Sequence, residues 1–170
     1  SNSSVITNED GWLKRGYNDD VSRCKFAVMN PELTYTLPAY QTASGCVDIL
    51  MHTMERYFTK AENTMLTDSV AEGLMRTVIY NAKVLAEDPE NYDARAQVMW
   101  AGSLSHNGLT GCGTEGDWAS HQLEHELGGM FDVAHGAGLA AVWGSWARYV
   151  YKEKPARFAQ FAANVFNIPW

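Results

Sequence analysis

The stretch HQLEHELGGMFDVAHG, residues 121–136, carries three histidines and two glutamates within sixteen positions. His121 and His125 are four apart, so on a helix their rings lie on one face and can chelate one metal ion. The residues that follow indicate a helix end, which places His135 near the start of the next helix with its ring able to turn back. The stretch therefore predicts a metal site built on helices. Spacing alone does not choose between His125 and His135 as a ligand.

A second pair of metal-binding side chains stands earlier, in VDILMHTMERYF, where Asp48 and His52 are also four apart. A lone aspartate on an apolar helix face is costly to bury unless it is paired or coordinated. Asp48 is therefore predicted to be a ligand, with a buried ion pair to an arginine as the alternative. His106, in SLSHNG, is interpreted more simply as a solvated histidine favoured by a helix C-terminus.

Glu124 turns the first histidine pair into H-x-x-E-H, the pattern of the inverzincin peptidases. In those enzymes the two histidines bind zinc and the glutamate acts as general base. Such a site needs a further protein ligand. After this motif the chain offers only two glutamates, Glu126 and Glu153, so a zinc metallopeptidase is kept as an alternative with few candidate ligands.

Apolar residues at three-to-four spacing predict helices over about 39–59, 64–86 and 92–108. The second of these helices has the core-facing stripe Leu66, Val70, Leu74, Val78 and Leu85. DWASHQLEHEL is also helical in period, with Asp117 as its N-cap, and two further helices are predicted in GLAAVWGSWARYVYK and ARFAQFAANVF. The G-x-G-x-x-G pattern at 111–116 lies between helices, so it indicates a flexible turn and not a dinucleotide site.

The first thirty residues differ from the rest of the chain. VIT and KFAVMN predict short strands separated by polar, turn-rich connections such as NEDG. Pro38 suits the first turn of the helix that follows. The sequence thus divides into a β fragment over 1–37 and a mainly helical part over 38–170, and the uncapped apolar run at Trp170 indicates a domain truncated at its C-terminus.

Composition and charge favour a small-molecule partner. The formal net charge of −7 argues against a nucleic-acid-binding surface and against a polybasic membrane anchor. No apolar run reaches the roughly 18 residues of a membrane span. Three cysteines, Cys24, Cys46 and Cys112, without a C-x-x-C pair favour free thiols in a cytoplasmic protein.

Four segments resemble the iron-containing alcohol dehydrogenases, in particular the NAD(P)H-dependent butanol dehydrogenase and aldehyde reductase branch. They are SNSSVIT, NPELTYTLPAYQTASGCVDILMHTMERYFT, ENYDARAQVMWAGSLSHNGL and DWASHQLEHELGGMFDVAHGAGLA, and together they cover nearly the whole chain. The resemblance implies a mainly α fold, the helical metal-binding domain of the dehydroquinate synthase-like fold. Residues 38–170 then form that catalytic domain, and 1–37 are a β remnant of the N-terminal α/β cofactor domain.

The resemblance also implies a site. Its metal ligands are one aspartate and three histidines: Asp48, His52, His121 and His135. This donor set suits Fe²⁺ or Zn²⁺. His125 becomes the histidine near nicotinamide and substrate, Lys14 resembles a lysine that contacts the cofactor, and Glu124 falls where the family varies, which removes the reason to expect a peptidase base.

The activity that the resemblance implies is the interconversion of primary alcohols and aldehydes, such as butanol and butanal, with NAD(P)H. The ion polarises the carbonyl, hydride from the dihydronicotinamide attacks its carbon, and His125, or a water that it holds, transfers the proton. A homodimer is expected for the full-length enzyme. Because the pyrophosphate loop is absent, the isolated chain is expected to be inactive, and a non-catalytic helical fragment stays an alternative.

Overall fold

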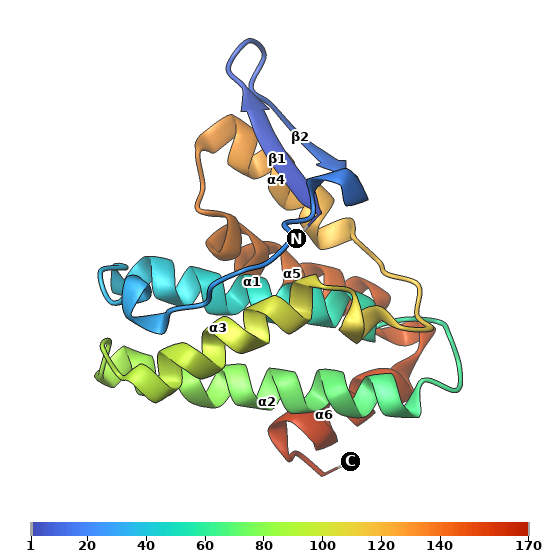
Figure 1. Cartoon of the computed structure of the whole chain (residues 1–170). Coiled ribbons are helices and arrows are strands. Elements are labelled where there is room, and N and C mark those ends of the chain that lie inside the picture. The colour runs from blue at the N-terminus through green and yellow to red at the C-terminus, as the bar shows by residue number, and fades with distance from the viewer. Residues whose placement is uncertain (1, 170) are drawn as a thin grey trace.

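The computed structural model describes residues 2–169, and it shows a helical body with a β-hairpin standing above it (Figure 1). The helices are α1 (Ala39–Tyr57), α2 (Met65–Glu87), α3 (Tyr92–His106), α4 (Ala119–Phe131), α5 (His135–Val150) and α6 (Pro155–Phe166). The strands are β1 (Ser3–Asn8) and β2 (Leu13–Asn18), and they pair antiparallel. The mainly α prediction is confirmed.

The predicted helices all have counterparts. The ranges 39–59, 64–86 and 92–108 correspond to α1, α2 and α3 within three residues at each end. In the predicted stripe of α2, Leu74, Val78 and Leu85 are buried, whereas Leu66 is 77% exposed. Leu66 lies in the first turn of α2, where Asp68 is the residue that is buried.

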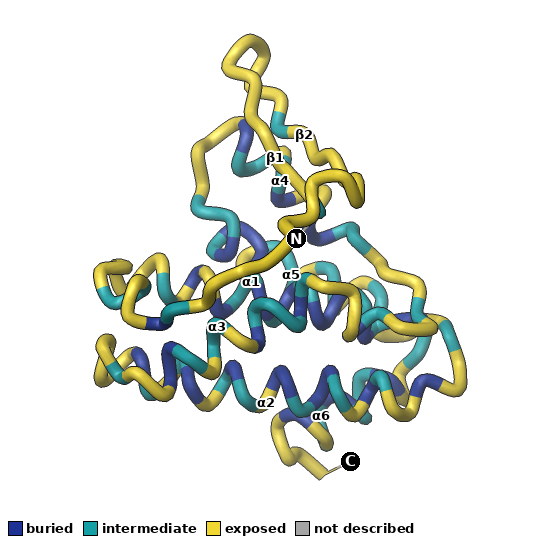
Figure 2. Tube along the Cα trace, viewed as in Figure 1, coloured by how far each residue is buried: buried dark blue, intermediate teal, exposed yellow. Residues whose placement is uncertain are grey.

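The predicted strand KFAVMN is wrong. Residues 23–30 have no regular secondary structure, and the second strand is LKRGYN, which pairs with β1 from Ser3↔Asn18 to Asn8↔Leu13. A strand is stable only when its backbone has a partner. In the described part of the chain β1 pairs with β2 alone, and Figure 2 shows the segment after the hairpin exposed along its length.

The core lies on both sides of α1. One apolar cluster joins α1 to α2, α5 and α6, and it comprises Met51, Met54, Tyr57, Ala71, Met75, Leu139, Phe161 and Val165. A second cluster joins α1 to α2 and α3, and it comprises Cys46, Ile49, Leu74, Val78 and Ala101. The helix that carries Asp48 and His52 is therefore the central element of the body, as the dark blue stretches of the Cα trace show (Figure 2).

The start of α4 differs from the predicted cap. Asp117 is not the N-cap residue, because the helix begins at Ala119 and Trp118 occupies the cap. The Asp117 carboxylate still accepts a hydrogen bond from the Ala119 amide at 2.9 Å. The Asp117 amide donates to the Glu55 carbonyl at 2.9 Å, which ties the entry of α4 to α1.

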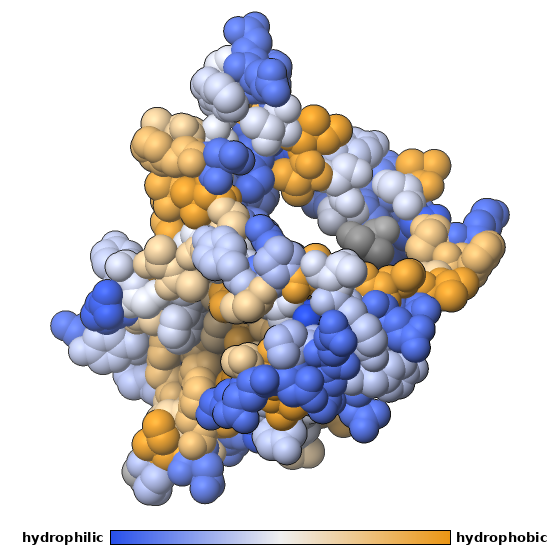
Figure 3. Space-filling view, turned by 90° about the vertical axis from the view of Figure 1, so that its left-hand side faces the viewer, coloured by the Kyte–Doolittle hydropathy of each residue, from blue (hydrophilic) through white to orange (hydrophobic). Residues whose placement is uncertain are grey.

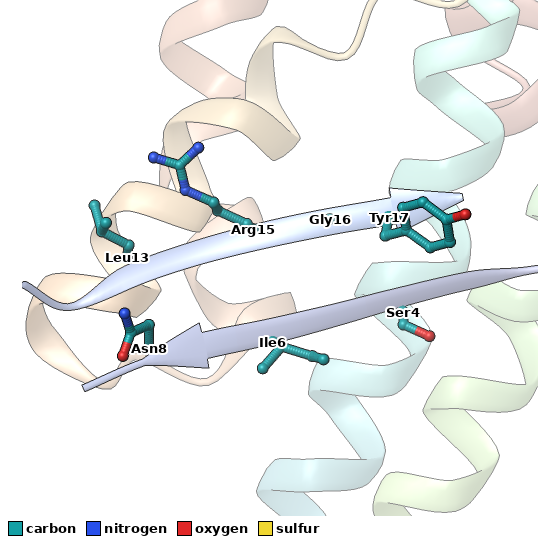
Figure 4. Close-up of a pocket in the computed structure, with 7 residues that line it drawn as sticks. All are labelled: Ser4, Ile6, Asn8, Leu13, Arg15, Gly16 and Tyr17. Carbon is teal, nitrogen blue, oxygen red and sulfur yellow. The ribbon is translucent and has the colours of Figure 1, made fainter. Parts of the chain in front are cut away.

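The upper part of the molecule, meaning the hairpin with α4, leaves many apolar side chains uncovered (Figure 3). Its large exposed hydrophobic residues include Ile6, Trp12, Leu13, Tyr17, Leu123, Met130 and Phe131. One face of the hairpin packs on α4, and the opposite face forms a shallow hollow lined by Ile6, Arg15 and Tyr17 among others (Figure 4). Trp170 lies outside the described residues, and none of the helices within 2–169 is long and apolar enough to cross a membrane.

Candidate metal centre

Candidate metal-binding side chains from four helices meet where α1 faces α3, α4 and α5. Helix α1 contributes Asp48 and His52, and the other three helices contribute His106, His121 and His135 in turn. Their candidate ligand atoms form two overlapping trios that share Asp48, and within each trio all atoms lie within 4.8 Å of one another. The fold therefore brings together in one place residues that are far apart in the sequence.

A glycine in the first turn of α5 allows His135 to lie next to Asp48 of α1. Helix α4 ends at Asp132, which has a left-handed φ of 54°, and α5 begins with His135 as predicted. A Cβ on Gly136 would overlap the main-chain oxygen of Ser44 in α1. Glycine is thus required for the first turn of α5 to lie directly on α1.

Distances around Asp48 match those between the ligands of a single ion. Its Oδ1 lies 3.3 Å from His135 Nε2 and 3.7 Å from His121 Nε2. His52 Nδ1 lies 3.0 Å from the Asp48 main-chain oxygen, which can only accept, so this nitrogen donates and the other nitrogen of His52 is the candidate ligand atom. Ligand atoms about 2.1 Å from a tetrahedral ion lie about 3.4 Å from one another. The side chains are therefore already close to the spacing that a bound divalent cation requires.

Two buried glutamates fix the orientation of two of the rings. The Nδ1 atom of His121 bonds to the Glu55 carboxylate, and the Nδ1 atom of His135 bonds to the Glu124 carboxylate. An ionised carboxylate only accepts, so each Nδ1 donates, and in the neutral ring the lone pair on Nε2 is then available to a metal ion. Carboxylate–histidine pairs of this kind orient metal-binding imidazoles.

Glu55 was not among the residues that the sequence predicted for the site. It is 1% exposed and also accepts a hydrogen bond from the His121 amide at 3.2 Å. The available signal was its position seven residues after Asp48, which places both carboxylates on one face of the same helix.

Unsatisfied atoms inside the cluster indicate the missing partner. Among the described residues, the buried Asp48 Oδ1 and His121 Nε2 have no hydrogen-bond partner. These two atoms lie 3.7 Å apart, beyond hydrogen-bond distance. Leaving buried polar atoms unpaired costs about 1–3 kcal/mol for each group. A cation between these atoms would satisfy both, so the residues present fit a bound divalent metal.

The ionisation of these groups reflects their mutual contacts. Burial opposes the charge on Asp48, but the histidines around it outweigh burial and hold the pKa of this carboxyl well below its usual range. Burial likewise opposes the charge on His121, yet its contacts with Asp48 and Glu55 raise its pKa to about 9. For His52 the effect of burial is larger than that of the nearby Asp48 carboxylate, so the pKa of His52 is lowered.

His125 and Lys14 lie at the rim of the cluster. The ring of His125 is centred 5.5 Å from that of His135. Burial lowers the pKa of His125, and the positive charge of Lys14 lowers it further. Lys14 extends from β2, and its Nζ lies 3.5 Å from Glu124 Oε2. The two residues that the resemblance assigns to the cofactor therefore lie on the same side of the cluster.

The geometry does not support the peptidase hypothesis. The rings of His121 and His125 are centred 6.2 Å apart and nearly perpendicular, and no candidate metal trio in the described chain contains both. Glu124, the presumed general base, is fully buried and bonds to His135 and Lys14. It positions a ring and is not placed to activate a water molecule.

The prediction that His106 is a solvated helix-end histidine is wrong. His106 does end α3, but its ring lies 3.8 Å from the ring of His52, and its Nε2 lies 3.5 Å from Asp48 Oδ2. The sequence places His106 on a helix end without showing that this end meets α1. Trp118 closes the same side, with its ring 5.3 Å from that of His121 and under the Arg56 guanidinium.

Residues 42–168 match the family model for the C-terminal part of the Fe-containing alcohol dehydrogenase family. The chain belongs to this family. The match covers α1 to α6, and thus every histidine of the cluster. The resemblance seen in the sequence is confirmed.

Individual relatives point to one branch of the iron-containing alcohol dehydrogenases. The chain is 39% identical to NADH-dependent butanol dehydrogenase A of Clostridium acetobutylicum and 39% identical to NADPH-dependent aldehyde reductase YqhD of Escherichia coli, over 97% of its own length in both cases. The crystal structure of a butanol dehydrogenase A from Thermotoga maritima superposes with a TM-score of 0.96 at 37% identity, over 99% of this chain and 42% of that one. The chain spans 43% of each of the two curated relatives.

Proposed function

We propose that this chain supplies the metal centre of an NAD(P)H-dependent alcohol dehydrogenase or aldehyde reductase that interconverts primary alcohols and aldehydes such as butanol and butanal. One observation carries the proposal: oriented imidazole Nε2 atoms surround the buried, unpartnered oxygen of Asp48. The names of the relatives, which include NADH-dependent butanol dehydrogenase and NADPH-dependent aldehyde reductase, support this substrate class.

The proposed ligand set is Asp48, His52, His121 and His135. Three imidazoles and one carboxylate suit Fe²⁺ or Zn²⁺. A divalent ion held there supplies Lewis-acid polarisation of the substrate oxygen. Glu55 and Glu124 hold two of the rings in place, and Trp118 covers one side of the cluster and limits the access of water to it.

His125 is the proposed proton-transfer residue. Its lowered pKa keeps the imidazole neutral near pH 7, and a neutral imidazole can accept the proton that an alcohol oxygen loses on oxidation. Lys14, on β2, brings a positive charge to the same rim, where an anionic dinucleotide can meet it. Both residues are proposed to contact the cofactor.

The division into domains follows from the same picture. We assign 38–170 to the metal-binding domain and 1–37 to the cofactor domain, of which the hairpin is the part that reaches α4. The uncovered apolar side chains of the hairpin support this assignment. A homodimer and a cytoplasmic location belong to the proposal, and the latter is supported by three free cysteines, two of them exposed.

Turnover by the full-length protein tests the function. We expect it to reduce butanal with NADH or NADPH, to lose activity with a chelator, and to regain it with Fe²⁺ or Zn²⁺. A chain of these 170 residues alone is expected to show no NAD(P)H oxidation, since it spans 43% of each of the two curated relatives. A full-length protein that binds the metal but turns over no alcohol or aldehyde would refute the proposed reaction.

A further inference from the structure

His106 occupies a position that the proposed four-ligand set does not explain. Its Nε2 lies 3.5 Å from Asp48 Oδ2, a distance between the 3.3 Å and 3.7 Å at which His135 and His121 face Oδ1. The two oxygens of the same carboxylate therefore face three imidazole nitrogens at similar distances.

Hydrogen bonds at the end of α3 fix the tautomer of His106. Its Nδ1 lies 2.9 Å from the Gly102 carbonyl oxygen, which can only accept, so Nδ1 carries the hydrogen. The Ser105 hydroxyl lies 2.7 Å from the same Nδ1 and 3.0 Å from the same carbonyl. Since the hydroxyl donates its one hydrogen to the carbonyl, its oxygen is free to accept from Nδ1. A neutral His106 thus presents a bare Nε2 lone pair to Asp48.

This arrangement is the one already found for His121 and His135. In each case a main-chain or side-chain oxygen accepts a hydrogen bond from Nδ1, and Nε2 faces the Asp48 carboxylate. Two acceptors held 3.5 Å apart repel each other unless a cation lies between them. His106, His52 and Asp48 also form a candidate metal trio of their own.

We propose that His106 is a fifth metal ligand, which binds through Nε2 on the Oδ2 side of Asp48. The inference rests on the proposed metal centre and deepens it, because the donor set becomes one carboxylate and four imidazoles. Zinc-type sites accept a fifth ligand. An additional nitrogen ligand favours late first-row ions such as Co²⁺ and Zn²⁺ over harder ions such as Mn²⁺.

Cobalt substitution of the full-length protein tests the proposal directly. Co²⁺ absorbs strongly in the visible when four-coordinate and more weakly when five-coordinate, so its spectrum reports the number of ligands. We expect His106→Leu to strengthen this absorption and to lower Co²⁺ affinity, measured by chelator competition, by more than about tenfold. His106→Gln should act in the same direction.

Gln97→Leu is the matched control, because Gln97 is an exposed polar residue on the same helix α3 and is not assigned to the metal. It should leave the Co²⁺ affinity and spectrum unchanged. Helical circular dichroism of each variant without metal checks that the fold is kept. An unchanged spectrum and affinity in folded His106→Leu would overturn the proposal. If Asp48→Ala and His121→Leu also retained Co²⁺ at full affinity, the proposed metal centre itself would fail.

Discussion

Two of the buried polar clusters within residues 2–169 differ in how completely their hydrogen bonds are made. Between α2 and α6, the Asp68 carboxylate accepts two bonds of 2.5 Å from Arg157, and Glu72 accepts bonds from Tyr57, Gln160 and Asn164. Around Asp48, by contrast, carboxylate and imidazole atoms face one another, and Asp48 Oδ1 and His121 Nε2 have no partner within the described chain.

The difference separates a structural network from a binding site. Both clusters contain buried charges, and both shift the pKa of an aspartate downward. In the Asp68 cluster the protein supplies every partner itself, so the network can hold α6 on α2 without a ligand. In the Asp48 cluster, Asp48 Oδ1 and His121 Nε2 are buried without a hydrogen-bond partner among the described residues, which is the property expected of a site that binds a cation.

The largest expected effect is the loss of one half of the complete network. Arg157→Ala leaves the Asp68 carboxylate buried and unpaired, and it removes the bond from Arg157 Nε to the Tyr57 carbonyl. Breaking a buried pair costs about 3–5 kcal/mol of the free energy of unfolding. Urea unfolding of the full-length variant without metal measures this loss.

Arg76→Ala is the control for that experiment. Arg76 is an exposed arginine on α2 that donates to the Asn164 carbonyl of α6, so it spans the same two helices without a buried carboxylate. Its loss should cost less than about 1 kcal/mol. Equal losses for the two arginines would show that the buried network is no more important than surface contacts.

Asp48→Ala should have the next largest effect, which is a loss of metal affinity. It removes the one carboxylate that faces the imidazole Nε2 atoms of His106, His121 and His135. We expect metal affinity to fall by more than the roughly 100-fold that outer-shell changes can cause. Elemental analysis and calorimetry give the result, and Asp93→Ala, an exposed aspartate in α3, should bind metal as the unchanged protein does.

Glu55→Gln should weaken metal binding less. The amide oxygen can still accept from His121 Nδ1, but the negative charge that makes the ring a better ligand is lost. The expected loss of metal affinity is about 10–100-fold. Glu124→Gln should cause a similar loss, because Glu124 accepts the hydrogen bond from His135 Nδ1. Glu126→Gln, on the exposed face of α4, serves as the control. Full affinity in both buried variants would mean that these carboxylates do not tune the site.

The sequence predicts the parts of the site that depend on local geometry. Asp48 and His52 share a helix face because they are four residues apart. The turn residues after α4 predict that His135 lies near the start of the next helix, and His135 is the first residue of α5. These features follow from the helical period and from the turn residues between α4 and α5. The structure brings these residues together with His121, although their role as ligands stays a prediction.

Other parts depend on which elements meet in space. The sequence shows that His106 ends a helix, but only the packing of α3 on α1 places its ring against His52. KFAVMN has strand-forming residues and no partner, whereas LKRGYN has weaker strand propensity and is paired by β1. Tertiary contacts decide both outcomes, and a single sequence does not display them.

The smallest expected effect is the part of the pH dependence of stability that comes from the Asp68 cluster. Burial raises the pKa of Asp68, but the hydrogen bonds and charge of Arg157 outweigh it, so the folded-state pKa lies below the ordinary value of about 3.9. A depressed folded-state pKa contributes stability above the ordinary pKa, and this contribution is lost as the pH falls through the folded-state value. Urea unfolding of the metal-free protein between pH 6 and pH 3 should therefore show a decline that is reduced in Asp68→Asn. The Asp93→Asn variant, at an exposed position of α3, should keep that decline because its Asp68–Arg157 pair is intact, and an equal loss of the decline in both variants would contradict the role given to Asp68.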